Sequence, residues 1–122
     1  MSTYKRFEDL PVWQTAATLY ERCDDFLEHV PPSMRYPVRD QLDRAAFSVS
    51  NNIAEGFDGG SNAEFVKFLR YSQRSCSEVQ SQLYIALDQT YISQDEFDSL
   101  YEQAARTHAK VGGFIHYLLS NN

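Results

Sequence analysis

Residues 41–56 read QLDRAAFSVSNNIAEG, a stretch that places two opposed faces on one helix. At about 100° per residue, the apolar face carries Leu42, Ala45, Val49 and Ile53. The other face carries short polar and charged side chains with one aromatic ring beside them, namely Arg44, Phe47, Ser48, Asn51 and Glu55. The first face predicts a core, and the second predicts contact with another molecule.

The composition is that of a folded globular protein. The chain has 122 residues, 43% of them hydrophobic, which predicts a single domain over residues 1–122. No stretch approaches the roughly 18 apolar residues of a membrane span, and the first dozen residues lack the apolar run of a signal peptide. We therefore expect a soluble, cytoplasmic protein with no membrane partner. Cys23 and Cys76 fall on apolar stripes and are expected to be buried free thiols, not redox or metal groups.

Four segments show helical periodicity, at about 10–29, 37–57, 62–90 and 94–119. Pro37 is typical of a helix start, and Pro31 and Pro32 end the first segment. Ser61 with Glu64 and Ser93 with Glu96 have the spacing of a capping box. These segments, joined by short connections, predict an all-α, antiparallel, up-down four-helix bundle.

Two apolar seams contain unusual residues. In the third segment, Ser72 and Cys76 occupy seam positions, which predicts close helix packing against a bulky side chain such as Trp13 or Tyr20. In the fourth, His108 falls on the apolar stripe, and we interpret it as a hydrogen-bonded core imidazole, not a ligand or base.

Gly112 and Gly113 lie inside the fourth segment, where each costs roughly 1 kcal/mol relative to alanine. Either close packing or a kink accounts for them, or they form a flat spot for a neighbouring subunit.

Several short motifs between about residues 7 and 119 resemble those of one protein family. They are Asp9-Leu10, Val12-Trp13-Gln14, Arg44-Ala45-Ala46, Ser48, Asn52-Ile53-Ala54-Glu55-Gly56, Glu64-Phe65, Phe68-Leu69, Ser75 and Ser77-Glu78. The family is that of the four-helix-bundle proteins encoded in intervening sequences of bacterial 23S rRNA genes. The resemblance implies a small cytosolic bundle that assembles into a ring of five and has no established reaction. It also implies kinship with accessory proteins of diversity-generating retroelements, which bind nucleic acid and a reverse transcriptase.

Nucleic-acid binding has only limited support from the residues. Lys67, Arg70 and Arg74 lie opposite the apolar face of the third segment, at steps of three and four. This spacing is typical of a phosphate-binding stripe and also of an ordinary solvated face, and we expect no aromatic side chain close to the charges. The formal net charge of -6 opposes attraction to phosphates. We therefore favour a solvated or salt-bridged face, with nucleic acid as the alternative.

A second flank of the third segment is expected to join the subunit interface, because a closed ring needs two different patches that meet head to tail. Its residues are Tyr71, Ser75, Glu78 and Gln82. Within this set, Glu78 is a hypothetical ion-pair partner for Arg44, within or between subunits.

Patterns typical of enzymes are missing from the sequence. It contains no Glu-x-x-His pair and no glycine-rich phosphate loop between a strand and a helix. We therefore expect no enzyme activity, no cofactor and no metal. The favoured function is a homo-oligomeric binding or scaffolding module, most simply a pentamer. A nucleic-acid-binding accessory protein is the alternative, and an unrecognised hydrolase is a third.

Overall fold

A computed structural model describes residues 4–120 of the chain, and this part is all-α. It comprises η1 (Phe7–Asp9), α1 (Pro11–Glu28), α2 (Tyr36–Asp58), α3 (Asn62–Asp88) and α4 (Gln94–Ser120). Each long helix begins and ends within two residues of the range expected from the sequence. None of these helices is long and apolar enough to cross a membrane.

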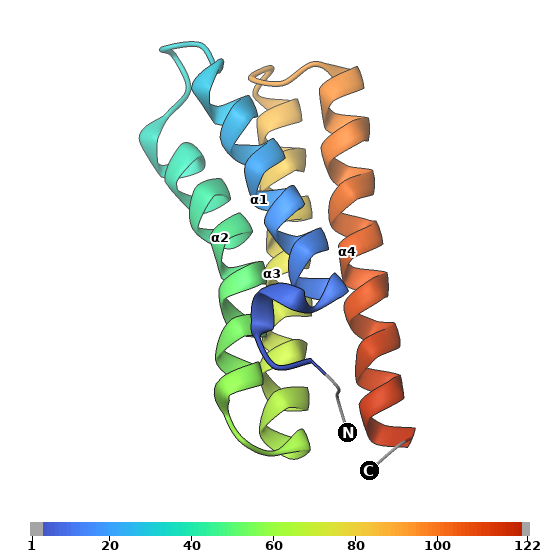
Figure 1. Cartoon of the computed structure of the whole chain (residues 1–122). Coiled ribbons are helices and arrows are strands. Elements are labelled where there is room, and N and C mark those ends of the chain that lie inside the picture. The colour runs from blue at the N-terminus through green and yellow to red at the C-terminus, as the bar shows by residue number, and fades with distance from the viewer. Residues whose placement is uncertain (1–3, 121–122) are drawn as a thin grey trace.

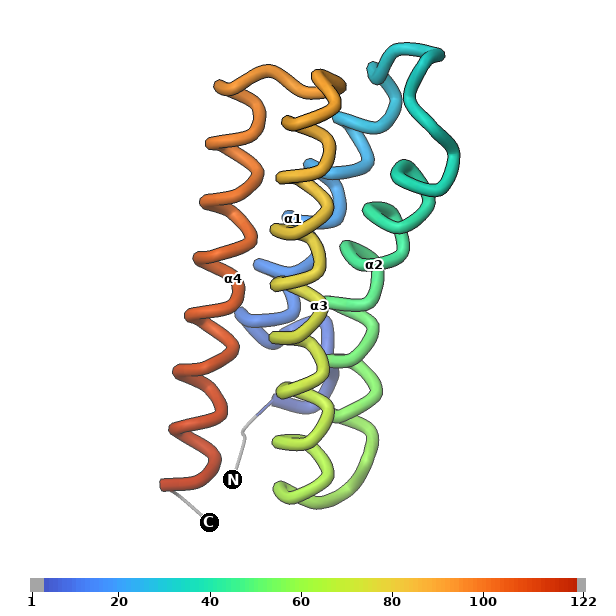
Figure 2. Tube along the Cα trace, turned by 180° about the vertical axis from the view of Figure 1, so that it is seen from behind, coloured from blue at the N-terminus to red at the C-terminus, as the bar shows by residue number. Residues whose placement is uncertain are grey.

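The four helices form an antiparallel up-down bundle (Figures 1 and 2), which confirms the predicted fold class. Each helix packs against its neighbours in sequence, and α4 closes the bundle against α1. The short η1 contacts both α1 and α2. As a result α2 and α3 are neighbours along one side, and α3 and α4 along the next.

Local sequence signals explain where the helices begin. Pro11 is the first residue of α1, where the missing N–H of proline costs no helical hydrogen bond. At the start of α4, the N–H of Glu96 donates to Ser93 Oγ at 3.1 Å, and the N–H of Ser93 donates to Glu96 Oε1 at 3.3 Å. This is a complete capping box. At the start of α3 the N–H of Glu64 donates to Ser61 Oγ at 3.1 Å.

The predicted core faces of α2 and α3 are buried, but one predicted contact is wrong. Ser72 is fully buried and donates to the backbone carbonyl of Val49 at 2.8 Å, so it faces α2 and not a bulky side chain of α1. Trp13 instead packs edge-to-face on Phe7, with centroids 5.4 Å apart. The small side chain at position 72 lets the backbones of α2 and α3 approach closely. The carbonyl of Val49 satisfies the buried Ser72 hydroxyl.

The apolar stripe of α4 includes Thr107 in place of His108, which corrects the expectation for that histidine. Thr107 is fully buried and donates to the carbonyl of Gln103 at 2.8 Å, whereas His108 is only half-buried. The two positions differ by 100° around the helix, and the hydroxyl of Thr107 can be satisfied by its own helix. His108 therefore lies at the edge of the core, next to α3.

Candidate functional site

The outer face of α2 carries the predicted polar stripe and an exposed aromatic ring. Arg44, Asn51 and Glu55 are exposed, and Ser48 is half-buried. Phe47 is 53% exposed, as expected for a side chain outside the core. One edge of its ring packs on Tyr20 of α1, with centroids 5.9 Å apart. Phe47 is thus held against α1 while half of its surface faces solvent.

Arg44 pairs with a different carboxylate from the one hypothesised. Its Nε lies 3.2 Å from Asp40 Oδ2, one turn earlier on the same helix, so the pairing with Glu78 is not formed within the subunit. An exposed pair of this kind contributes at most about 1 kcal/mol, because both charges remain hydrated. Arg44 can therefore exchange Asp40 for a carboxylate of another molecule at little cost.

The second predicted patch, on the flank of α3, is only partly at the surface. Glu78 is exposed, and Tyr71 and Gln82 are half-buried. Ser75 is only 5% exposed, so its placement on a non-core flank is wrong. It lies three residues after Ser72, on an adjoining part of the helix surface, and so belongs with the buried residues of α3.

The three basic residues of α3 are exposed, as predicted. The groups that surround them differ from the prediction. The ammonium of Lys67 lies 3.5 Å from Glu64 and 5.8 Å from the centroid of the Phe68 ring. The guanidinium of Arg74 lies 5.5 Å from the centroid of Tyr71. The expectation that no aromatic ring lies near these charges is therefore wrong. Both contacts are in the range of cation–π attraction.

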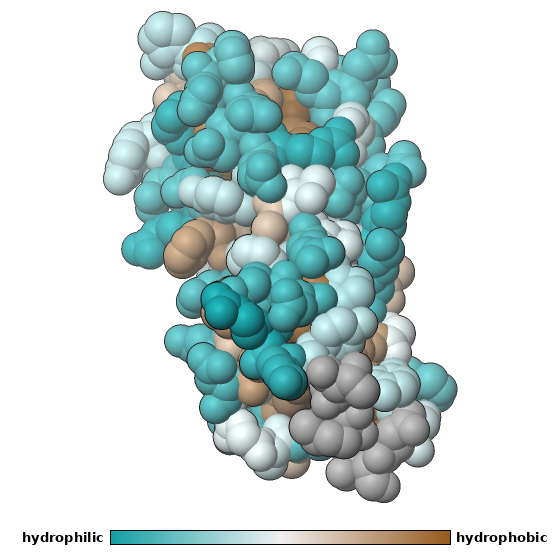
Figure 3. Space-filling model, in the orientation of Figure 1, coloured by the Kyte–Doolittle hydropathy of each residue, from teal (hydrophilic) through white to brown (hydrophobic). Residues whose placement is uncertain are grey.

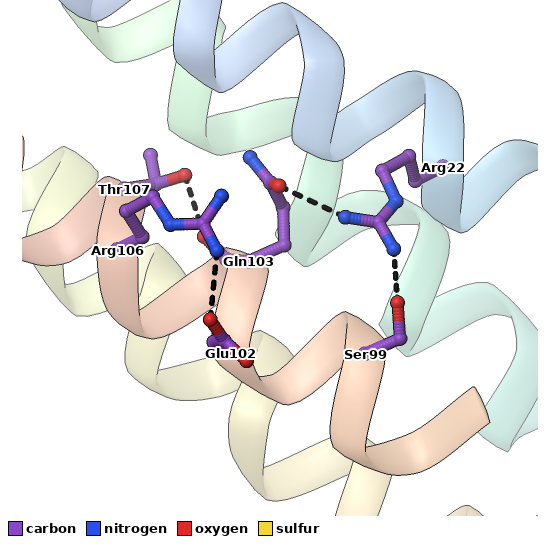
Figure 4. Close-up of polar contacts among 6 residues, drawn as sticks. All are labelled: Arg22, Ser99, Glu102, Gln103, Arg106 and Thr107. Atoms are coloured by element: carbon purple, nitrogen blue, oxygen red, sulfur yellow. Dashed lines mark hydrogen bonds and ion pairs between the residues drawn. The ribbon is translucent and has the colours of Figure 1, made fainter. Parts of the chain in front are cut away.

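A polar cluster between α1 and α4 was missed by sequence reasoning (Figure 4). Arg22 Nη1 donates to Gln103 Oε1 at 2.9 Å, and Arg22 Nη2 donates to Ser99 Oγ. Gln103 is only 5% exposed, so without Arg22 its carbonyl oxygen would be buried and unsatisfied. The signal was a glutamine inside the apolar stripe of α4, but the facing arginine could not be identified before the helices were paired.

A shallow groove of about 480 Å³ adjoins this cluster, between the end of α1 and the start of α4. The groove is lined by charged, polar and apolar side chains, namely Arg22, Asp25, Phe26, His29, Asp95, Glu96, Ser99 and Leu100. Across residues 4–120, no three His, Cys, Asp or Glu side chains are grouped so as to hold a metal ion. Figure 3 shows the face that α1 crosses as largely hydrophilic, with hydrophobic side chains scattered over it. Because Arg22 of α1 donates to Gln103 and Ser99 of α4, it acts as a structural bridge between these two helices.

Both cysteines are buried and free, as expected. Burial raises the pKa of Cys23 and that of Cys76 to about 12. Each thiol is therefore protonated at neutral pH and is a poor nucleophile.

The two glycines of α4 have different surroundings. A Cβ on Gly112 would lie 3.0 Å from Gln73 Nε2, so close packing accounts for this glycine. A Cβ on Gly113 would meet no atom within 4 Å, so packing within the subunit does not account for it.

Comparisons with known proteins identify the family. The family model described as 23S rRNA-intervening sequence protein matches residues 8–113, which is most of the chain. The chain belongs to this family. A crystal structure of a protein of unknown function from the S23 ribosomal protein family of Bacteroides thetaiotaomicron is similar in fold, with a TM-score of 0.78 and 19% identity. The match covers 85% of this chain and 97% of the other. None of the curated proteins matches the chain.

Proposed function

We propose that this member of the intervening-sequence family is a cytoplasmic, non-enzymatic scaffolding or binding module that works as a homo-oligomer. The observation that carries the proposal is Phe47, which is 53% exposed on the outer face of α2. Short side chains adjoin the ring, and Ser48 and Asn51 lose little entropy when they are fixed in an interface. The two free thiols are typical of a reducing compartment.

Two different surfaces are available for a closed ring. Phe47 lies on the edge of α2 that faces α1, because its ring contacts Tyr20. Gln73 of α3 contacts α4, and Tyr71, Glu78 and Gln82 are about 140–180° around the helix from Gln73, at about 100° per residue. A contact between unlike patches of neighbouring copies generates a ring when the rotation closes. Five copies are proposed because the family resemblance implies a five-membered assembly.

The chemistry of the described residues favours binding over catalysis. Both thiols are held protonated by burial, which disfavours a cysteine nucleophile. Arg22, which lines the groove between α1 and α4, is already hydrogen-bonded to Gln103 and Ser99.

Phe47→Asp tests the assembly. A carboxylate in the centre of the contact would be desolvated, so we expect the mutant to fall from about five times the chain mass to the monomer mass. Light scattering coupled to size exclusion, at tens of micromolar protein, measures this change. Helical circular dichroism should be largely unchanged, because the ring lies outside the core.

Tyr36→Asp is the matched control, since Tyr36 is also on α2 and is 72% exposed, at the far end of the helix. This variant should keep the wild-type mass. A wild-type monomer at the same concentration would refute the assembly, and unfolding of the Phe47 variant would show that the ring belongs to the core.

A nucleic-acid-binding accessory role is the second candidate function. The contact between Arg74 and Tyr71 favours it, because an aromatic ring beside a cation is a common element of single-strand binding surfaces. The net charge of -6 opposes it.

A further inference from the structure

Positive charge is concentrated where the first half of α3 lies beside the second half of α4. Residues 65–77 and 103–120 together contain five Lys or Arg and no Asp or Glu. Lys67 and Arg106 pair with Glu64 and Glu102 just outside these segments, so the charges without an ion pair are those of Arg70, Arg74 and Lys110. The two helices run antiparallel, and Gln73 Nε2 donates to the carbonyl of His108 at 3.3 Å, so the two segments are neighbours (Figure 2). The molecule therefore has a local basic face despite its net charge of -6.

A groove of about 260 Å³ lies on this face, between α3 and α4. Its walls are Arg70, Gln73, Arg74, Ser77 and His108. Each of these side chains can donate a hydrogen bond, and none is a carboxylate. By contrast, the two other grooves described in residues 4–120 each have three carboxylates in their walls. The chemistry of this groove selects an anion.

The two arginines of the groove have no carboxylate partner. Within residues 4–120, Arg44, Lys67 and Arg106 each form an ion pair, whereas neither Arg70 nor Arg74 has a carboxylate within 4.0 Å. Arg70 and Arg74 are one helical turn apart, where like charges repel. An anion held between them would remove that repulsion, and the folded chain contains none at this place.

Part of the groove is fixed before any ligand arrives. The bond from Gln73 to the carbonyl of His108 holds one wall, and Gly112 provides the room for the Gln73 amide, because a Cβ there would lie 3.0 Å from its nitrogen. On the other wall, Arg74 stacks over Tyr71. Restrained donors lose less entropy on binding than free ones.

We propose that this groove binds the phosphate group of a small phosphorylated molecule. Guanidinium groups pair with phosphate through two parallel hydrogen bonds, and a terminal phosphate carries more charge than a phosphodiester. The volume lies below the roughly 300–1,000 Å³ of sites for drug-sized ligands, which favours a small ligand. The groove lies between α3 and α4, and Arg74 in its wall contacts Tyr71 of the proposed subunit interface.

Titration with inorganic phosphate and with glycerol phosphate tests the proposal, followed by amide chemical shifts in NMR at constant ionic strength. We expect saturable shifts confined to residues 70–77 and 105–112. Arg70→Gln with Arg74→Gln should weaken binding at least about tenfold. Ser77→Asp, a single exposed substitution that places a carboxylate in the groove, should abolish it. Circular dichroism verifies that each variant is folded.

Arg106→Gln with Lys110→Gln is the matched control, since it removes the same charge from exposed positions outside the groove walls. It should leave the affinity unchanged. An equal loss in this control, or shifts that do not saturate, would overturn the proposal. A single-stranded oligonucleotide without a terminal phosphate separates the sources of phosphate, and saturable binding of that probe alone would assign the groove to nucleic acid and also overturn the proposal.

Discussion

Cys23 and Cys76 make the stability of the bundle depend on alkaline pH. Burial raises the pKa of each thiol from 9.0 to about 12, so above pH 9 the unfolded chain releases protons that the folded chain keeps. Below pH 9 the thiols are protonated in both states and the free energy of unfolding does not depend on them. As the pH rises from 9 towards 12, their ionisation in the unfolded chain lowers the free energy of unfolding. The slope is roughly 1.4 kcal/mol per pH unit for each thiol.

Urea unfolding at pH 8, 9 and 10 measures this dependence, with a reducing agent present. We expect the double variant Cys23→Ala/Cys76→Ala to lose the thiol contribution, so that its free energy of unfolding falls less steeply than that of the wild type. Other alkaline groups contribute equally to both proteins. Parallel curves would mean that the thiols are not buried as described.

For single residues, the sequence predicts solvent exposure well when the position lies far from the apolar face of its helix. It predicts exposure poorly for positions at the edge of that apolar face. Phe47 lies well outside the apolar stripe of α2 and is exposed, as expected. Ser75 and His108 lie at face edges, where a rotation of some tens of degrees decides burial. That rotation depends on which helix packs alongside, so periodicity alone misplaced both residues.

At the scale of the helices, local sequence determines where each helix begins and ends. The side-chain contacts between helices depend on which helices are paired. Prolines and the serine caps act within one turn, which is why the predicted helix ranges agree with the structure. The bond from Ser72 to Val49 and that from Arg22 to Gln103 each join two helices. No periodic pattern within one helix identifies such a partner, so the polar bridge between α1 and α4 was not predicted.

Close packing between α2 and α3 leads to a prediction on glycine. A Cβ on Gly56 would lie 2.8 Å from Phe68 Cβ and 3.3 Å from the carbonyl oxygen of Phe65, so α3 would have to move. We expect Gly56→Ala to lower the free energy of unfolding by about 1–3 kcal/mol.

Gly113→Ala is the contrasting variant, because its Cβ meets no atom within 4 Å. It should raise the free energy of unfolding by up to about 1 kcal/mol, through helix propensity alone. Thermal or urea unfolding measures both variants. A loss of stability in Gly113→Ala would instead indicate that a neighbouring subunit packs against α4.

At the scale of the whole molecule, charge is separated along the bundle. The end that contains the α1–α2 and α3–α4 connections is rich in carboxylates, including Asp24, Asp25, Asp95 and Glu96. The basic face of α3 and α4 lies towards the other end. Oppositely charged regions allow a small anion to bind locally while a long polyanion meets repulsion from the rest of the surface.

We therefore predict no tight binding of generic duplex DNA or RNA at about 0.15 M salt. Five copies at -6 each would carry about -30, and a polymer longer than one groove extends beyond the roughly 8 Å over which the basic face is felt. Fluorescence anisotropy with a labelled duplex, at several salt concentrations, measures the affinity. A sub-micromolar, salt-sensitive dissociation constant would contradict the prediction. In that event, neutralising Lys67, Arg70 and Arg74 together should reduce the slope of log affinity against log salt by up to about three contacts, and an unchanged slope would place the nucleic-acid surface elsewhere on the bundle.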